Sequence, residues 1–292
     1  MRLPFHLSCV LLAVFVVVGC SQQVVPQQAI ATAHPTATAV GMEILARGGN
    51  AFDAAVAVSA TLAVVEPYSS GVGGGGFWLL HRASDGKQIM IDGREVAPQR
   101  AQRDMYLDAQ GNVQTQRSMD GALAAAIPGM PAALTQLAKQ YGKLSLKESL
   151  QPAIRAANEG FVVTAHYQRM AEFRLPVLRA SSATSAIFLH NNAVPPLGHK
   201  IVQMDLARTL QALAEKSAAG FYQGEVAQQL VAGVTAAGGI WTVEDLKNYQ
   251  IQQREPIVFE YRGYRIVSAP PPSSGGVALA QMFNMLSQFD KT

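Results

Sequence analysis

A long apolar segment at residues 51–65, AFDAAVAVSATLAVV, shows no regular polar face. Asn50 stands where a helix cap is expected, Asp53 falls in the first turn, and Pro67 follows the last apolar residue. These signals predict a helix of about four turns. Because a helix that is apolar nearly all round is buried, we expect this one to lie inside the protein, with small residues that let another element approach closely.

The flanking segments predict a helix layer over a sheet. Upstream, the sequence TATAVGMEILA predicts a second helix, which Gly48 and Gly49 end. Downstream, two apolar runs at 77–80 and 88–91 surround an Asp-Gly pair, a dipeptide typical of a β-hairpin. We expect this hairpin to pack on the buried helix.

Between the buried helix and the hairpin, Gly71, Gly73 and Gly76 match G-x-G-x-x-G, the spacing of a dinucleotide-binding turn. That turn requires a strand before the glycines and a helix after them, because the pyrophosphate sits at the helix N-terminus. Here the predicted order is helix, glycines, strands, and the acidic residue expected about twenty positions on would be Glu95, beyond the hairpin. We therefore interpret residues 73–76 as a tight turn into a core strand, and expect no nucleotide cofactor.

The rest of the chain predicts helices and strands in mixed order, which indicates an α/β (α+β) protein. The expected elements are helices at 128–142, 145–160 and 165–181, an irregular stretch at 181–200, helices at 205–218 and 225–237, strands at 256–261 and 264–269, and a helix from near Val277. Ser273 and Ser274 precede this last helix and are interpreted as caps. We assign them no catalysis, because no base stands beside them in sequence.

The first twenty residues, MRLPFHLSCVLLAVFVVVGC, have the pattern of a signal peptide. A basic residue precedes an apolar stretch at 7–18, which is too short to span a membrane as a stable helix. A glycine–cysteine pair ends the segment and resembles a bacterial lipobox. We expect residues 1–20 to be a lipoprotein-like signal peptide, Cys20 to be lipidated and residues 21–28 to form a tether. An ordinary signal peptide or an uncleaved anchor stays open, and each alternative predicts export, either to the periplasm or to a membrane-anchored position.

The amino-acid composition argues against several classes of partner and site. The chain has 292 residues, 49% hydrophobic and 15% charged, which suits a large core. The net charge of +3 comes without a run of Lys and Arg, so nucleic acid is not an expected partner. Cys9 is the only cysteine besides Cys20, and the six histidines form no close ligand pair, so we expect neither a disulfide nor a metal site. The G-x-S-x-G motif of serine hydrolases does not occur either.

Several stretches, in one order, resemble the γ-glutamyltranspeptidases (γ-glutamyltransferase / glutathione hydrolase). They are HPTATAVGMEILARGGNAFDAAVAV, VVEPYSSGVGGGGFWLL, DGREVAPQRAQRDMY, AAIPGMPAAL, GFYQGEVAQQLV, GGIWTVEDLKNYQ and PPPSSGG. Together they cover nearly all of the chain after the tether, and residues 29–292 are identified as part of a large-subunit domain of that family.

The resemblance implies an N-terminal-nucleophile hydrolase fold, an αββα sandwich that is incomplete here. It also implies a zymogen that cuts itself into a large and a small subunit. The new N-terminal threonine of the small subunit is then the nucleophile, activated by its own α-amine. It attacks a γ-glutamyl amide such as glutathione, and water or an amino acid releases the glutamyl group from the acyl-enzyme.

The sequence departs from that family at the cleavage site. The family carries Thr-Thr-His there, and this tripeptide does not occur in residues 1–292. We therefore expect no catalytic residue in this chain, a missing small subunit as its partner, no activity of this polypeptide alone, and apolar faces that make it prone to aggregate.

Arg94, in DGREVAP, matches the family's arginine that binds the substrate α-carboxylate. A guanidinium suits that task because its planar fork pairs two oxygens at once. Without the resemblance, Arg94 would be interpreted as a structural ion pair with Glu95 or Asp92. His34 and Tyr68 also lie in family-like stretches, and packing is the role expected for each.

Two alternatives stay open at this stage. A related acylase acting on glutaryl side chains would share this part of the sequence. A non-catalytic lipoprotein could instead keep the large-subunit surface as a binding module.

Overall fold

The protein is described by a computed structural model, in which the described residues are 28–289. Cys20, the signal peptide and all but the last residue of the tether lie outside the described residues. The elements are α1 (Pro35–Ala46), α2 (Ala51–Val65), β1 (Phe77–Arg82), β2 (Lys87–Asp92), α3 (Met130–Tyr141), α4 (Leu146–Glu159), β3 (Phe161–Val162), α5 (Ala165–Phe173), α6 (Leu175–Ala180), α7 (Ser182–Phe188), β4 (Lys200–Ile201), α8 (Met204–Lys216), α9 (Ala219–Tyr222), α10 (Gly224–Ala236), α11 (Val243–Lys247), β5 (Gln252–Arg254), β6 (Ile257–Tyr261), β7 (Tyr264–Ser268) and α12 (Ser274–Leu286).

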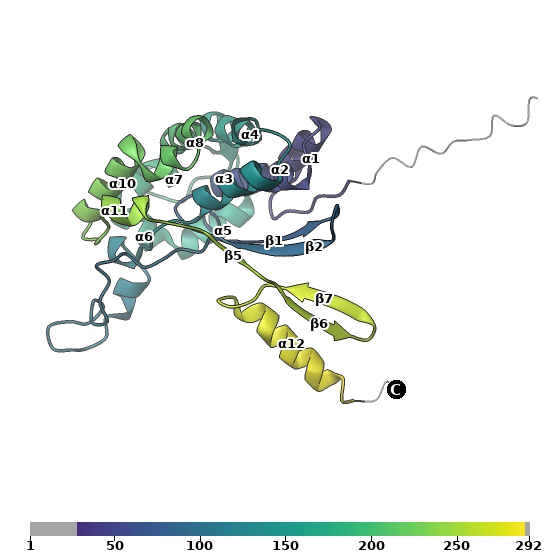
Figure 1. Cartoon of the computed structure of the whole chain (residues 1–292). Coiled ribbons are helices and arrows are strands. Elements are labelled where there is room, and N and C mark those ends of the chain that lie inside the picture. The colour runs from purple at the N-terminus through teal and green to yellow at the C-terminus, as the bar shows by residue number, and fades with distance from the viewer. Residues whose placement is uncertain (1–27, 290–292) are drawn as a thin grey trace, which may run out of the picture.

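Helices α1 to α11 form a body above an antiparallel sheet of order β1-β2-β5 (Figure 1). The register pairs Phe77 with Asp92 across β1 and β2, and β5 joins the other edge of β2. Strands β6 and β7 pair separately, and with α12 they form an arm, residues 256–289, that projects from the body (Figure 1). The predicted hairpins at 77–91 and 256–269 are both confirmed.

Helix α2 lies at the centre of the body, as its apolar sequence predicts. Its Asn50 side chain accepts hydrogen bonds from the backbone N–H groups of Phe52 and Asp53, and the Asp53 carboxylate accepts from the Asn50 N–H at 2.8 Å. Asp53 is fully buried and accepts two further bonds, from the N–H groups of Lys143 and Leu144. The cap therefore also fixes the turn between α3 and α4.

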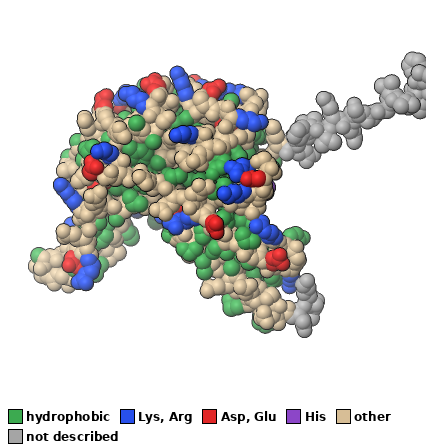
Figure 2. Space-filling model, viewed as in Figure 1, with side chains coloured by type: hydrophobic (Ala, Val, Ile, Leu, Met, Phe, Trp, Pro, Cys, Tyr) green, Lys and Arg blue, Asp and Glu red, His purple; other side chains and the backbone are tan. Residues whose placement is uncertain are grey.

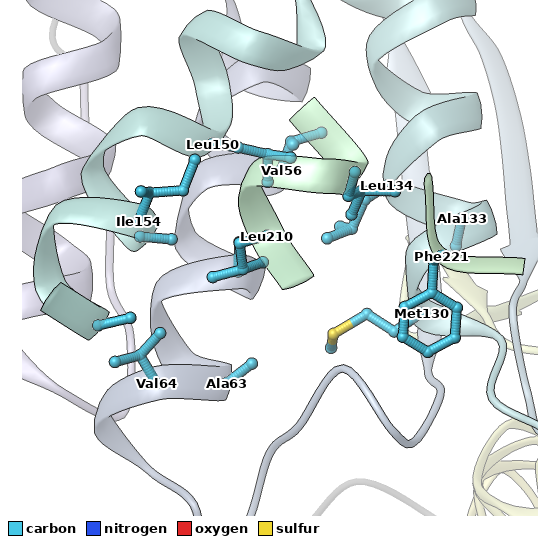
Figure 3. Close-up of a cluster of buried hydrophobic side chains, with 14 of the residues drawn as sticks. Val56, Ala63, Val64, Met130, Ala133, Leu134, Leu150, Ile154, Leu210 and Phe221 are labelled. Carbon is cyan, nitrogen blue, oxygen red and sulfur yellow. The ribbon is translucent and has the colours of Figure 1, made fainter. Parts of the chain in front are cut away.

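The main core gathers around α2, α3, α4 and α8 (Figure 3). Val56 and Val64 of α2, Leu134 of α3, Leu150 of α4 and Leu210 of α8 are each fully buried. The sheet packs on the same core through Leu80, Ile89 and Ile91, which gives the predicted helix layer over a sheet. In the described part of the chain, no helix is long and apolar enough to cross a membrane.

Four local expectations were wrong. Residues 165–181 form two helices, α5 and α6, because Pro176 lacks the N–H that would continue the first one. The stretch 181–200 is not wholly irregular, since the Ser181 side chain accepts a hydrogen bond from Thr184 N–H and caps α7. Helix α12 begins at Ser274 rather than near Val277, and the Ser273 side chain makes no capping hydrogen bond.

Candidate functional site

The glycine-rich segment before β1 brings the chain close to the residues after β2. Gly76 and Gly93 exchange backbone hydrogen bonds at 3.2 and 3.0 Å, which continues the β1–β2 ladder. A Cβ on Gly75 would clash with the Gly93 carbonyl oxygen and press on the Arg94 Cα. The order helix, glycines, strand is confirmed, and the close approach explains Gly75, whereas a Cβ on Gly73 would meet nothing.

Arg94 directly follows this contact, and both of its backbone polar groups are bound by side chains. Its N–H donates to the Asp92 carboxylate at 3.0 Å, and its carbonyl oxygen accepts from the Tyr249 hydroxyl at 2.7 Å. The Asp92 carboxylate is buried and also accepts from Arg254 Nε of β5 at 2.7 Å. The backbone at Arg94 is therefore fixed by partners from β2 and from the segment after α11.

The side chain of Arg94, by contrast, is 54% exposed. Its Nε lies 3.3 Å from a Glu95 carboxylate oxygen, and its guanidinium carbon lies 5.8 Å from the centre of the Phe77 ring. None of its guanidinium N–H groups donates a hydrogen bond to another residue within 28–289. Arg94 thus combines a fixed backbone with a guanidinium whose N–H groups can donate to a carboxylate.

Tyr249 reaches Arg94 from 155 positions away in the sequence. Its ring stacks on that of Tyr222, with centroids 5.6 Å apart and planes 3° apart. The buried Tyr222 hydroxyl donates to the Pro128 carbonyl oxygen at 2.8 Å, which anchors the pair to the start of α3. Burial, then the nearby charges of Asp92 and Glu95, raise the pKa of Tyr249 to about 12, so its hydroxyl remains a donor at physiological pH.

The sequence singled out Arg94 as a candidate binding residue and gave no indication of Tyr249. The NYQ sequence that carries Tyr249 lies in a family-like stretch, yet nothing in its local pattern indicates a partner in the segment after β2. Of the two ion pairs that sequence alone allows for Arg94, the structure contains the one with Glu95, whereas the Asp92 side chain pairs with Arg254.

The other sequence-selected residues have structural roles. His34 caps α1 through its Nδ1, which accepts from Thr36 N–H at 3.2 Å. Burial lowers the pKa of His34, against an opposing effect of the Glu66 charge. Tyr68 packs edge-on against His166 and Tyr167, with ring centroids 5.0 and 6.1 Å away. Packing was the role predicted for both residues; Tyr68 packs as predicted, whereas the His34 ring caps α1.

A separate cavity of about 270 Å³ opens beside Tyr68. Its lining consists of Pro67, Tyr68, Tyr167, Met170, Ala171, Arg174, Val177, Leu178, Thr184 and Phe188. The Arg174 guanidinium is paired with Asp120, so this cavity presents an apolar wall rather than an unpaired charge. Arg94 does not line it, and over residues 28–289 no group of three or more His, Cys, Asp and Glu side chains could hold a metal ion.

An open hollow lies beneath the body, between the arm and the loop that leads from β2 towards α3 (Figure 2). The arm carries many exposed hydrophobic side chains, namely Val258, Tyr264, Leu279, Met282, Met285, Leu286 and Phe289, which are 38% to 75% exposed. Exposed apolar groups gathered in this way mark an interaction surface more often than an isolated exposed leucine does.

The family model described as "Gamma-glutamyltranspeptidase" matches residues 37–292. The chain is 41% identical over 265 residues to a glutathione hydrolase proenzyme of Escherichia coli, a match that covers 90% of this chain and 46% of the relative. It is 38% identical over 268 residues to an acylase ACY 1 proenzyme of a Pseudomonas species, covering 89% of this chain and 48% of the relative. The chain thus spans about half the length of these relatives.

Among solved structures, the Helicobacter pylori γ-glutamyltranspeptidase matches with a TM-score of 0.85 and 39% identity. The match covers 91% of this chain and 77% of that one. The expected fold class is therefore confirmed, with the described residues supplying part of the fold.

Proposed function

The chain belongs to the γ-glutamyltranspeptidase family, and from that premise we propose that residues 29–292 are part of the large subunit of an exported γ-glutamyltransferase or glutathione hydrolase. The complete enzyme would cleave γ-glutamyl amides, glutathione among them, and pass the glutamyl group to water or to an amino acid. Support comes from the ordered sequence motifs, from relatives that are named proenzymes and from the structural match.

The observation that carries this proposal is the pattern of hydrogen bonds at Arg94. Its backbone is held on both sides, while its guanidinium N–H groups make no hydrogen bond within the described range. The fork would bind the α-carboxylate of a γ-glutamyl donor through two parallel hydrogen bonds. This binding would place the γ-carbonyl at a fixed distance from the guanidinium.

The nucleophile would come from a threonine outside residues 1–292, at the N-terminus of a small subunit. Its hydroxyl oxygen would form a bond to the γ-carbonyl carbon, and its own α-amine would take the hydroxyl proton. The amide C–N bond then breaks and the amine leaves with that proton. Water or an amino acid next attacks the ester and frees the threonine.

The small subunit would also cover the exposed arm. The hydrophobic side chains on β6, β7 and α12 are exposed to solvent, and the arm that carries them borders the hollow in Figure 2. We propose that the small subunit fills this hollow and covers them, since an exposed apolar surface of this kind is otherwise prone to aggregation.

The first test compares two proteins. Purified residues 1–292 are expected to release no aniline from a γ-glutamyl anilide, whereas the complete processed precursor is expected to do so. Measurable turnover by residues 1–292 alone would refute the proposed origin of the nucleophile.

The second test addresses Arg94 in the complete enzyme. Arg94→Lys keeps the charge but loses the paired geometry, so KM for the γ-glutamyl donor is expected to rise about tenfold or more. Arg103→Lys is the matched control, because Arg103 has a 94% exposed side chain and is not part of the site. An unchanged KM in Arg94→Lys would remove the assignment.

A related acylase remains a second candidate, because the Pseudomonas acylase is 38% identical. A glutaryl group has the same length as a γ-glutamyl group and the same terminal carboxylate, but it lacks the α-amino group. Arg94 would therefore serve either substrate. The ratio of kcat/KM for a γ-glutamyl amide and the corresponding glutaryl amide distinguishes the two enzymes, and loss of both activities in the complete precursor would favour a non-catalytic binding module.

Export through a lipidated Cys20 is part of the proposal and concerns residues outside the described range. Mass spectrometry of the mature N-terminus would reveal an acylated cysteine. A mature chain that starts beyond Cys20, or that retains residue 1, would refute lipidation.

A further inference from the structure

We propose that Tyr249 is a positioning residue for Arg94, and that it sets the affinity for the donor carboxylate without touching the substrate. This inference rests on the proposed function of Arg94. It goes beyond that function by assigning a role to a residue on a distant segment.

The first support is the way the segment after β2 is attached to the segment around α11. Tyr249 donates to the Arg94 carbonyl oxygen at 2.7 Å, and the Asp245 carboxylate accepts from the Gln99 N–H at 2.8 Å. These two bonds hold residues 94–99 at both ends against one short element. Asp245 is itself fixed, because it completes a capping box with Thr242 at the start of α11.

The second support is the way Tyr249 is held in place. Its ring lies parallel to that of Tyr222, whose hydroxyl is bound to Pro128. A Cβ on Gly129 would clash with both the Tyr249 hydroxyl and the Gly93 carbonyl oxygen. The backbone at Gly129 therefore packs directly on the contact between Tyr249 and the Arg94 turn, which leaves this contact little room to shift.

The third support is the contrast between the two parts of Arg94. The guanidinium is exposed, and within the described residues its contacts are an ion pair with Glu95 and the face of the Phe77 ring, so these contacts define its place poorly. The backbone N–H and carbonyl group, by contrast, are both bound. The starting point of the side chain, and hence its reach, is set through Asp92 and Tyr249.

The test uses Tyr249→Phe in the complete processed enzyme. This change removes one hydroxyl and keeps the ring on Tyr222. KM for a γ-glutamyl donor is expected to rise about fivefold, the effect of one hydrogen bond, with kcat changed less than about twofold, because the reacting carbonyl is unaffected once the donor is bound.

Tyr167→Phe is the matched control. The Tyr167 hydroxyl also donates to a backbone carbonyl oxygen, that of Phe188 at 2.8 Å, but Tyr167 makes no contact with Arg94. Loss of the Tyr167 hydroxyl is expected to lower thermal stability and to leave KM for the γ-glutamyl donor unchanged. Equal rises of KM in both variants would show a general structural effect and overturn the proposal.

A double variant separates this inference from the proposed function. If Tyr249 acts through Arg94, Tyr249→Phe is expected to add no further rise of KM to Arg94→Ala. If Arg94→Lys and Arg94→Ala raise KM but Tyr249→Phe alone does not, the positioning role is wrong and the function of Arg94 stands. If neither Arg94 variant changes KM, the function of Arg94 fails.

A readout that needs no turnover supplements the kinetics. In residues 1–292, the order parameter of the Arg94 Nε–H group, measured by nuclear magnetic resonance, is expected to fall in Tyr249→Phe and to stay unchanged in Tyr167→Phe. An unchanged order parameter in Tyr249→Phe would contradict the proposed restraint.

Discussion

Helices α2 and α12 are both rich in apolar residues, but they differ in how much of that surface is buried. In α2, most residues from Asp53 to Val65 are buried against α1, α3, α4 and the sheet. In α12, only Gly276 is buried, although Phe283 stacks on Tyr261 with centroids 4.5 Å apart. The body supplies α2 with partners on all sides, whereas the arm supplies α12 with one strand pair.

This comparison separates helix formation from burial. Both helices form where their sequences predict one, within a few residues. Whether an apolar side chain contributes to stability depends on the surface that covers it. Within the described residues, most apolar side chains of α12 lack such a cover, which the proposed small subunit would supply.

The largest expected difference between the two regions is the cost of removing a leucine. Leu150→Ala in α4 is expected to lower the free energy of unfolding by about 2–5 kcal/mol, because Leu150 is fully buried. Leu279→Ala in α12, where the side chain is 38% exposed, is expected to cost about 0.5 kcal/mol or less in residues 1–292. Urea unfolding followed by circular dichroism measures both losses of unfolding free energy. Equal losses in the two variants would contradict the difference in burial between α4 and α12.

The next difference concerns the serines that precede α4 in the body and α12 in the arm. The Ser145 side chain accepts a hydrogen bond from Glu148 N–H, so Ser145→Ala is expected to cost about 1 kcal/mol. Ser273 precedes α12 without such a bond, and Ser273→Ala is expected to stay within about 0.5 kcal/mol. The same unfolding experiment tests this pair. If Ser273→Ala lowered the unfolding free energy about as much as Ser145→Ala, the Ser273 side chain would have to cap α12.

A smaller change in the free energy of unfolding is expected at acid pH, and its source is Asp245 of α11, in the body. Burial alone would raise the pKa of Asp245, but hydrogen bonds from Gln99 and Thr242 outweigh it and hold this pKa below its usual value. A lowered folded-state pKa stabilises the fold above the unfolded pKa of about 4, and this stability is lost as the pH falls through the folded value.

Asp245→Asn is therefore expected to reduce stability at pH 7 and to flatten its decline below about pH 4. Unfolding midpoints measured at a series of pH values would detect this change. An acid slope identical to that of the wild type would show that Asp245 does not contribute. The first turn of α12 has no acidic residue, so the cap of that helix adds no comparable acid dependence.

The smallest effect on folding is expected for a charge placed on the exposed face of the arm. Met285 is 60% exposed, so Met285→Glu is expected to change the unfolding free energy of residues 1–292 by about 0.5 kcal/mol or less. It is also expected to reduce self-association, as measured by light scattering at one concentration. Gln281→Glu adds the same charge at an exposed polar position of α12 and serves as the control. Equal effects of both variants would mean that charge, rather than the apolar face, controls association.

Local sequence determined most of the elements. The caps at Asn50 and Ser145, the Asp-Gly turn between β1 and β2, and the glycines that end α1 and α10 all act within a few residues. The pattern of apolar residues also predicted that α2 is buried. Short elements such as β5 were missed, because the QQR of that strand has no alternating pattern and pairs with β2 only through tertiary contact.

The sequence by itself also determined the family, because the ordered motifs are readable along the chain, and the resemblance to that family made Arg94 the candidate for binding a carboxylate. Only the tertiary structure decided how Arg94 is held. The hydroxyl that binds its carbonyl group comes from Tyr249, and the carboxylate of Asp92 pairs with Arg254 of β5. Hydrogen bonds between residues more than 150 positions apart depend on how the layers pack, and no local pattern encodes that packing.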